Sequence, residues 1–345
     1  MRISDFSYDL PEELIAQKPL ANRDASRMLV VDRKRATWAD SQFSSLAKYL
    51  RNGDVVVINN TRVFPARLLG KRQESGGRVE ILLVREVDPL RWEALIRPGN
   101  RLREGASIQF VNLPLQAVVL DEPGREIRLL RFNSQQYLEE ALELVGEMPL
   151  PPYIRRPAGA SNEDRERYQT IFARERGAIA APTAGLHFTP NVIEMLKQGG
   201  IEIVEITLHV GYGTFEPVRV DEVEEHRVRP ETVEVTAAAA DIMNARRLGG
   251  GRVIAVGTTT TRALESASDA RGVVHPIRTD VSLTITPGYE FRVTDALLTN
   301  FHLPQSSLLL LVSAFAGREL VLAAYRHAVT ARYRFYSYGD CMLII

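Results

Sequence analysis

The sequence of 345 residues contains a single cysteine, Cys341, so it permits no internal disulfide and no zinc site built from several thiolates. It has no net charge, since 43 Lys and Arg balance 43 Asp and Glu, which argues against a polybasic membrane binder or a nucleic-acid coat. The longest aliphatic run, 308–312, is far shorter than the roughly 20 residues of a membrane-spanning helix, and the first residues lack a signal-peptide pattern. These absences predict a cytoplasmic protein without membrane contact.

The motifs of the common nucleotide-binding and hydrolytic enzymes are also missing. No Gly-x-Gly-x-x-Gly motif follows a predicted strand, and neither a Walker-type Gly-Lys-Ser/Thr loop nor a Gly-x-Ser-x-Gly motif occurs. The six histidines show no His-Glu-x-x-His or His-x-x-x-His spacing. We therefore predict no metal site; the alternative is a site assembled from side chains far apart in the sequence. The missing motifs also argue against dehydrogenases, P-loop enzymes, zinc proteases and serine hydrolases.

What is present is a globular composition, with 45% hydrophobic and 25% charged residues, and a length that allows about two domains. From 63 to about 132, short β-rich runs alternate with turn signals such as Ser75-Gly76-Gly77, a spacing typical of a small antiparallel barrel. On both sides of this region, predicted helices and strands alternate. We predict an α/β fold in which a mixed-sheet main domain, residues 1–62 and 150–345, is interrupted by an inserted antiparallel β-barrel domain, residues 63–149.

Helix starts are marked by side chains that can cap them. Thr189 is followed by Pro190 at the first helical position, and this helix is predicted to end at Gly199. Further helices are predicted over 42–50 after Ser41, 135–145 after Ser134, 163–173 after Ser161 or Asn162, 236–248 and 318–333.

One polar loop follows the predicted buried strand 252–256. The strand runs through Gly257 into four threonines, of which Thr258 and Thr259 are the first, and then into Arg262 at a helix start. Free backbone N–H groups, hydroxyls and a guanidinium together favour a binding site for a carboxylate or phosphate. The alternative is an ordinary capped helix with Arg262 and Glu265 on its solvated face.

Three more loops combine a histidine with small or polar residues. His187 follows the small residues of 181–185; the alternative is a hydrogen-bonded structural histidine. His209 precedes Tyr212, whose flanking glycines leave room for a planar ligand; the alternative is a plain turn. His302 lies in the irregular segment 299–304, which suits hydrogen bonding to a heterocycle; the alternative is helix capping.

Two regions suggest contact with nucleic acid. Basic and aromatic residues interleave over 325–340, as stacking on an unpaired strand requires, although a helix end that packs its aromatic rings into the core explains the pattern nearly as well. Positions 60–104 hold ten Lys or Arg against six Asp or Glu, which can follow a phosphate backbone or simply form a solvated surface.

These segments together resemble one family, the S-adenosylmethionine:tRNA ribosyltransferase-isomerases of queuosine biosynthesis. The similarity begins at Phe6-Ser7-Tyr8-Asp9-Leu10-Pro11 and extends to the last residues. It includes 17–19, 23–27, 59–63, 146–154, 167–170, 181–189, 209–215, 257–266, 299–304 and 333–343. So many matches in the same order make the resemblance specific.

The resemblance implies an unusual reaction. The ribosyl unit of S-adenosylmethionine moves onto the aminomethyl group of 7-aminomethyl-7-deazaguanine at the wobble position of tRNA, which gives epoxyqueuosine and releases adenine and methionine. S-adenosylmethionine is then a co-substrate that donates ribose and not a methyl group, so the methyltransferase glycine motif is not required. No prosthetic group is implied, and we expect a monomer.

The chemistry requires groups that take up and deliver protons, for which histidines and carboxylates suit neutral pH. The candidates that stand in family-like motifs are His187, His209, His302, Glu265 and Asp340. The candidates for binding S-adenosylmethionine are Gly257, Thr258, Thr259, Arg262 and Tyr212. A guanidinium can bind a carboxylate through two parallel hydrogen bonds, which lysine cannot do. We therefore expect Arg262→Lys to weaken S-adenosylmethionine binding while the melting temperature changes little.

The sequence departs from the family pattern in three places. Val228-Arg229-Pro230-Glu231 replaces the usual Met-His-Ser-Glu, Thr284-Ile285-Thr286 replaces Phe-Ile-Tyr, and Cys341 stands where alanine is usual. The first change removes a histidine, and the third argues against a cysteine nucleophile. An S-adenosylmethionine-dependent RNA methyltransferase and a non-catalytic RNA-binding protein remain the alternatives.

Overall fold

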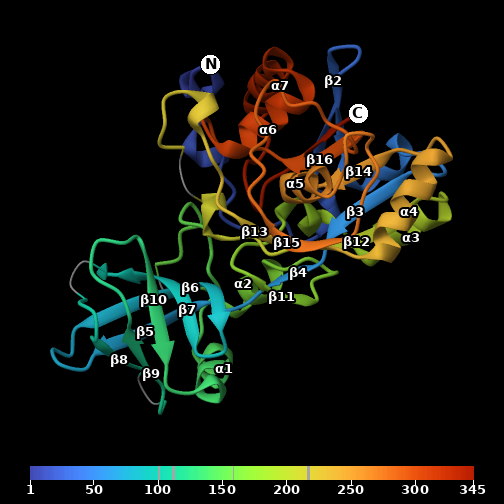
Figure 1. Ribbon diagram of the computed structural model, residues 1–345. Coiled ribbons are helices and arrows are strands. Elements are labelled where there is room, and N and C mark those ends of the chain that lie inside the picture. Colours follow the sequence, from blue (N-terminus) through green and yellow to red (C-terminus); the bar gives the residue numbers. More distant parts are fainter. Residues whose placement is uncertain (100–101, 111–112, 158, 216–217) are drawn as a thin grey trace.

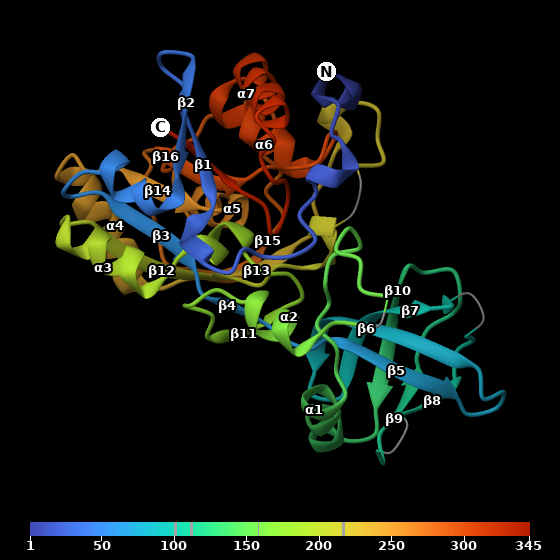
Figure 2. The same ribbon diagram turned by 180° about the vertical axis from the view of Figure 1, so that it is seen from behind.

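The computed structural model describes residues 1–99, 102–110, 113–157, 159–215 and 218–345. The chain forms an α/β lobe and a smaller β-barrel lobe, joined through a narrow connection (Figures 1 and 2). The predicted fold class is therefore confirmed.

The α/β lobe is built on a nine-stranded mixed sheet. Its strand order is β15-β13-β12-β3-β14-β16-β17-β1-β2, and β12, β3, β14 and β16 run parallel to one another. Strand β17 is antiparallel to β16 and parallel to β1. The strands are β1 (Arg27–Asp32), β2 (Thr37–Gln42), β3 (Val55–Asn59), β12 (Glu202–Leu208), β13 (Glu231–Val235), β14 (Val253–Val256), β15 (Ile277–Val281), β16 (Ala296–Asn300) and β17 (Cys341–Ile344).

Two hydrophobic cores cover the two faces of this sheet. Alternate residues of β3 point to opposite faces, so Val55 and Val57 belong to one core and Val56 and Ile58 to the other. The helices are α2 (Asn162–Arg167), α3 (Pro190–Gln198), α4 (Ala237–Leu248), α5 (Thr258–Ser266), α6 (Ser307–Ala316) and α7 (Arg318–Thr330). Short 3₁₀ helices cover Ile3–Phe6, Glu12–Leu14, Arg23–Ala25, Phe43–Tyr49, Thr183–His187, Tyr212–Phe215 and Val223–Glu225.

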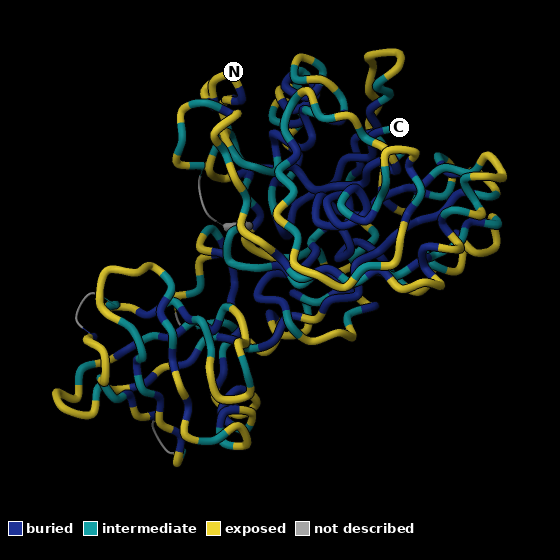
Figure 3. Tube along the Cα trace, in the orientation of Figure 1, coloured by how far each residue is buried: buried dark blue, intermediate teal, exposed yellow. Residues whose placement is uncertain are grey.

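The second lobe is a closed antiparallel barrel with the strand order β10-β7-β6-β5-β8-β9. Its strands are β5 (Arg67–Arg72), β6 (Arg78–Asp88), β7 (Arg91–Arg97), β8 (Ser107–Phe110), β9 (Gln116–Val119) and β10 (Ile127–Phe132), and helix α1 (Gln135–Leu144) follows. The barrel has a core of its own that includes Phe64 and Leu142, whereas Val63 and Met148 belong to a core of the α/β lobe. Figure 3 shows the buried residues running along the strands of both lobes, while the turns are exposed.

A small parallel pair of strands, β4 (Thr61–Val63) and β11 (Glu175–Ala178), lies where the chain leaves β3 and enters the barrel. Its register shifts between Arg176 and Ala178, which marks a β-bulge at Gly177. This pair brings the polypeptide around Gly177 next to the carboxyl ends of β3 and β12 (Figure 1).

Three of the predicted helices differ in the structure, and the first is the helix predicted over 318–333, which ends at Thr330, before Arg332 adopts a positive φ of 54°. Residues 43–49 form a 3₁₀ helix, and Ser41 belongs to β2, where its hydroxyl accepts a hydrogen bond from Tyr49 (3.1 Å) and caps nothing. Helix α2 ends at Arg167 because Gln169 leaves the helical path to hydrogen-bond both backbone groups of Val63. The predicted caps Ser134 and Thr189 are confirmed, and of the alternatives Ser161 and Asn162 the cap is Ser161.

The described part of the chain contains no single helix long and apolar enough to cross a membrane. Helices α6 and α7 pass this test only as a pair, and they are bent by 115° at the break between them.

Candidate active site

Four loops that carry polar side chains leave the same edge of the sheet. Because β3, β12, β14 and β16 are parallel, the segments that follow them begin at one edge, where α/β enzymes usually bind their ligands. Three of these segments belong to loops singled out in the sequence: in the structure they begin at His209, at Gly257 and, within the predicted loop 299–304, at Phe301. Three adjoining cavities lie among them.

The first cavity, which we call the loop cavity, is small, about 50 Å³. The 3₁₀ helix Thr183–His187, the start of α5, the segment after β16 and the C-terminal tract all contribute to its wall. Its lining includes Ala184, Thr258, Thr259, Asn300, His302 and Tyr336. Three segments predicted separately from the sequence therefore meet at one place.

The threonines at the start of α5 divide into two pairs. Gly257 adopts a φ of +93°, a backbone conformation that favours glycine, and allows the strand to turn into the helix. Thr260 and Thr261 donate to the carbonyls of Val256 (2.7 Å) and Gly257 (3.2 Å), whereas Thr258 and Thr259 line the loop cavity. The sequence could not separate these pairs, because all four residues are threonine.

Three polar atoms beside the loop cavity lack partners among the described residues. They are the hydroxyl of Tyr168, Oγ1 of Thr259 and Oδ1 of Asn300, and all are buried. A buried polar atom without a hydrogen bond costs about 1–3 kcal/mol, so such atoms are retained most readily where a ligand or water satisfies them.

His302 lies at the loop cavity, whereas His187 is set behind it. Nε2 of His302 is 2.8 Å from Oγ1 of Thr299, and burial lowers the pKa of His302 to about 3. Nδ1 of His187 is 2.9 Å from Oγ of Ser26, and burial lowers the pKa of His187 to about 4. Both rings are therefore neutral at pH 7. Asn300 lies beside His187, with Nδ2 at 3.4 Å from its Nε2.

The second cavity, the middle cavity, has a volume of about 380 Å³ and is lined by Arg262, Glu231, His226, Arg229 and Ser307, among others. Leu308 and Tyr336 line both it and the loop cavity, so the two adjoin. His226 lies 2.8 Å from the Ser307 hydroxyl, and burial, followed by the nearby Arg227 and Arg262, lowers the pKa of His226. His226 and Glu231 were not among the candidates, because the sequence offers no sign that they face a cavity.

Arg262 is buried beside the middle cavity and is already paired. Its Nη1 donates to Oε2 of Glu231 (2.6 Å), and its Nε donates to the carbonyl of Leu283 (3.1 Å). Its Nη2 is buried without a hydrogen-bond partner among the described residues. The guanidinium thus has one nitrogen left for a ligand.

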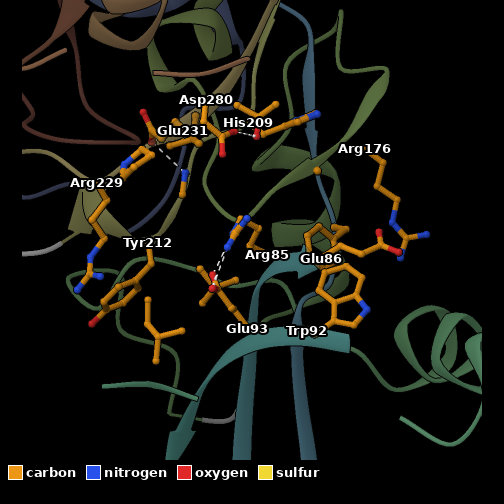
Figure 4. Close-up of a pocket in the computed structure, with 18 of the residues that line it drawn as sticks. Arg85, Glu86, Trp92, Glu93, Arg176, His209, Tyr212, Arg229, Glu231 and Asp280 are labelled. Atoms are coloured by element: carbon orange, nitrogen blue, oxygen red, sulfur yellow. Dashed lines mark hydrogen bonds and ion pairs between the residues drawn. The ribbon is translucent and has the colours of Figure 1, made fainter. Parts of the chain in front are cut away.

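The third cavity, the interdomain cavity, has a volume of about 620 Å³ and lies between the barrel and the α/β lobe (Figure 4). The barrel contributes Arg85, Glu86, Trp92 and Glu93, and the α/β lobe contributes Arg176, His209, Tyr212, Arg229, Glu231 and Asp280. Gly213, Arg229 and Glu231 line both this cavity and the middle cavity. Tyr212 therefore lies with His209 in the interdomain cavity and not with Thr258 and Thr259.

Glu265 and Asp340 line none of these cavities. The Glu265 carboxylate accepts hydrogen bonds from the backbone N–H groups of Arg292, Val293 and Thr294 at 2.8–3.2 Å and from the Tyr289 hydroxyl at 3.3 Å. The Asp340 carboxylate accepts from the backbone N–H groups of Arg27 (2.9 Å) and Arg334 (2.8 Å). Both carboxylates hold separate chain segments together.

The aromatic residues of the C-terminal tract mostly pack inside the protein. Tyr325, Tyr333 and Phe335 are fully buried and surround Phe301, with ring centroids 5.0–5.4 Å from its own. The interpretation of these rings as a nucleic-acid stacking surface is wrong, and the alternative of core packing is right.

Within the described residues, no three His, Cys, Asp or Glu side chains are grouped closely enough to hold a metal ion. Cys341 is buried on β17, where burial raises the pKa of its thiol.

Comparison with known proteins gives one consistent result. The sequence model of the family described as queuosine biosynthesis protein matches residues 3–344. The chain is 49% identical over 345 residues to the S-adenosylmethionine:tRNA ribosyltransferase-isomerase of Pelotomaculum thermopropionicum and 50% identical to that of Symbiobacterium thermophilum, with full coverage of each protein. It also resembles the crystal structure of S-adenosylmethionine tRNA ribosyltransferase from Thermotoga maritima, with 36% identity, a TM-score of 0.54 and coverage of 99% of this chain and 100% of that one.

Proposed function

The chain belongs to the queuosine biosynthesis family, and on this premise we propose that it acts as an S-adenosylmethionine:tRNA ribosyltransferase-isomerase. The acceptor is 7-aminomethyl-7-deazaguanine at the wobble position of tRNA, and the products are epoxyqueuosine-tRNA, adenine and methionine. The observation that carries this proposal is the set of three adjoining cavities at one sheet edge, which is large enough for two substrates to meet. The enzyme works as a monomer in the cytoplasm.

S-adenosylmethionine occupies the middle and loop cavities in this proposal. Nη2 of Arg262, buried and without a partner among the described residues, receives the methionine carboxylate. The start of α5, from Gly257 to Thr259, offers a hydroxyl and N–H groups to the nucleoside part. The unpartnered oxygens of Thr259 and Asn300 support this placement, because a nucleoside carries hydrogen-bond donors.

The modified base enters through the interdomain cavity. A planar base can stack between aromatic rings and guanidinium groups, and this cavity offers Trp92, Tyr212 and Arg176. The indole Nε1 of Trp92 is buried and has no hydrogen-bond partner among the described residues. Arg229 and Glu231 line both the interdomain and the middle cavity, so the acceptor amine and the ribosyl donor meet beside them.

His209 is the proposed proton acceptor for the substrate ammonium group, since it lines the interdomain cavity and is largely neutral at pH 7 because burial lowers its pKa. His302 contacts the donor in the loop cavity, and His187 supports Asn300 from behind. Glu265 and Asp340 act through the segments that they hold in place and do not touch substrate.

The test is a double-label transfer experiment. The protein is incubated with tRNA that carries the aminomethyl base and with S-adenosylmethionine labelled either in the ribose or in the methyl group. Ribose label on the tRNA, with adenine released, supports the proposal, and tRNA that carries guanine at the same position is the control. Methyl label on the tRNA would identify a methyltransferase instead, and binding of tRNA without transfer would identify a non-catalytic RNA-binding protein.

A further inference from the structure

Two residues outside the predicted site hold the ring of His209. Oγ1 of Thr61, on β4, is 2.8 Å from Nδ1 of His209, at the end of β12. Thr61 is fully buried, whereas His209 is partly exposed at the wall of the interdomain cavity. Thr61 therefore fixes one edge of the ring from inside the protein.

The Thr61 hydroxyl also has a second partner, which favours one direction for its hydrogen bonds. Its oxygen lies 3.4 Å from the backbone carbonyl of Glu175, which can only accept. If the hydroxyl donates its one hydrogen to this carbonyl, its oxygen must accept from His209. Nδ1 then carries the proton, and Nε2 keeps its lone pair. Among the described residues, no side chain or backbone group forms a hydrogen bond with Nε2.

Gly177 supports the flat side of the same ring. A Cβ added at Gly177 would lie 2.6 Å from Cε1 and Nδ1 and 2.8 Å from Cδ2 of His209, nearly equal distances that place it over the ring face. Only a residue without a side chain allows this approach. The β-bulge at Gly177 in the β4–β11 pair places the Gly177 backbone against the face of the His209 ring.

We propose that Thr61 and Gly177 are positioning residues that hold His209 as the Nδ1-protonated tautomer, with Nε2 available to accept a proton in the interdomain cavity. This inference rests on the proposed function. In the step concerned, one proton passes from the substrate ammonium nitrogen to Nε2, which leaves a neutral amine with its lone pair and an imidazolium on His209.

The charges around His209 are mixed and leave it neutral in the resting enzyme. Burial lowers the pKa of His209, and Glu175 on β11 and Glu234 on β13 oppose this effect. The other charged groups that line the cavity are Arg85, Glu86 and Glu93 of the barrel, Glu139 of α1, and Arg176, Arg229, Glu231 and Asp280 of the α/β lobe. Arg85 is bound through two hydrogen bonds of 2.9 Å to Glu93, so these two charges offset each other.

The tautomer is tested directly by ¹⁵N NMR of the whole protein labelled at its six histidines. The His209 signals are assigned by their loss in His209→Gln. We expect the shift of a protonated Nδ1 and an unprotonated Nε2 at pH 7. A protonated Nε2 would overturn the inference whatever the activity measurements show.

The kinetic test compares Thr61→Val, which keeps the shape but loses the hydroxyl, with Thr61→Ser, which keeps the oxygen. We expect Thr61→Val to lower kcat by about 10- to 100-fold, the loss seen when metal-binding histidines lose their second hydrogen-bond partner, with a changed pH profile and little change in KM for S-adenosylmethionine. Thr61→Ser should restore most of the rate. Equal effects of both variants on melting temperature and rate would indicate a structural role and overturn the inference.

Gly177→Ala provides an independent test, because its methyl group must displace the imidazole ring while Thr61 stays in place. It should lower kcat and change the His209 NMR signals. If His209→Gln transfers ribose at the wild-type rate, the positioning inference fails while the proposed function stands. If neither the wild-type protein nor any of the variants transfers ribose, the proposed function itself fails.

Discussion

Arg262 and Glu231 form a buried ion pair, with Nη1 at 2.6 Å from Oε2, and the second carboxylate oxygen of Glu231 accepts the backbone N–H of Gly211 at 2.9 Å. The pair thereby links α5 to β13 and to the loop that carries Tyr212. From the sequence, Arg262 either binds a ligand or lies on a solvated helix face; the structure contradicts the second alternative, because Arg262 is buried, and it adds a structural role for the guanidinium. The expectation that the melting temperature would hardly change on Arg262→Lys has to be revised for this reason.

We now expect Arg262→Lys to weaken both binding and folding. Lysine offers no planar fork, so the hydrogen bond to Leu283 or the one to Glu231 is lost, at a cost of about 1–3 kcal/mol in unfolding free energy. The loss of Nη2 should raise the KM for S-adenosylmethionine about 10- to 100-fold. Urea unfolding and steady-state kinetics measure the two effects.

Arg246→Lys is the matched control, because Arg246 forms a 2.9 Å ion pair with Glu202 at the surface, where such pairs contribute little. It should change neither quantity noticeably. A destabilised Arg262→Lys enzyme with an unchanged KM would show that Arg262 is structural only.

Glu265→Gln should reduce stability more than it reduces chemistry. An amide nitrogen placed against three backbone N–H donors leaves at least one hydrogen bond unmade, which costs about 1–3 kcal/mol. The unfolding free energy should fall by this amount, while kcat at a temperature where the variant is fully folded stays near the wild-type value. A fall in kcat of a hundredfold or more in folded protein would instead place Glu265 in the chemistry.

Acid should destabilise the protein partly through Asp164. Burial opposes ionisation of this side chain, but hydrogen bonds from Arg156 and Ser161 outweigh burial and lower the pKa of Asp164 to about 2. Since its folded pKa lies below the usual 3.8, Asp164 stabilises the protein at neutral pH, and this contribution of about 2 kcal/mol disappears as the pH falls from about 4 to 2. Asp164→Asn should be less stable at pH 7 and should lose less stability over that window; parallel pH curves would refute this.

The fragment 63–149 should fold by itself. Its barrel is closed, and among the described residues its core includes only Ile179 as a buried member from outside the fragment, with Tyr212 packed against it as a partly buried one. The fragment contains Trp92 as its one tryptophan, so fluorescence reports its unfolding without interference. A cooperative denaturation curve is expected. A fragment with no transition would show that the proposed boundaries at 62/63 and 149/150 do not delimit an independent domain.

Local signals in the sequence were sufficient for much of the secondary structure. The helix start at Thr189-Pro190, the barrel strands and the buried strand predicted over 252–256 all depend on neighbouring residues, and all are confirmed, the last as β14. The 3₁₀ helix at 43–49 and the early end of α2 were missed because tertiary contacts decide them, as in the hydrogen bonds between Gln169 and Val63.

The sequence predicted which loops form the candidate site more successfully than it predicted the role of each residue in those loops. Small residues, glycines and hydroxyls after strands pointed to segments that do converge, as Thr259 and Asn300 illustrate. Individual roles depend on which way a side chain points. No pattern of neighbours distinguishes Glu265, enclosed by backbone N–H groups, from a carboxylate open to a cavity, and none indicates that Thr61 contacts His209 from 148 positions away.

The position of β17 sets an order for synthesis and folding. This strand contains Cys341–Ile344, yet it lies between β16 and β1 inside the sheet and pairs in parallel with a strand made more than 300 residues earlier. A ribosome-bound chain therefore carries β1 with one neighbour missing until β17 emerges, whereas the barrel is complete once β10 and α1 have been made. Loss of β17 would accordingly open the middle of the sheet, and a stop codon at position 341 should give a protein that is degraded.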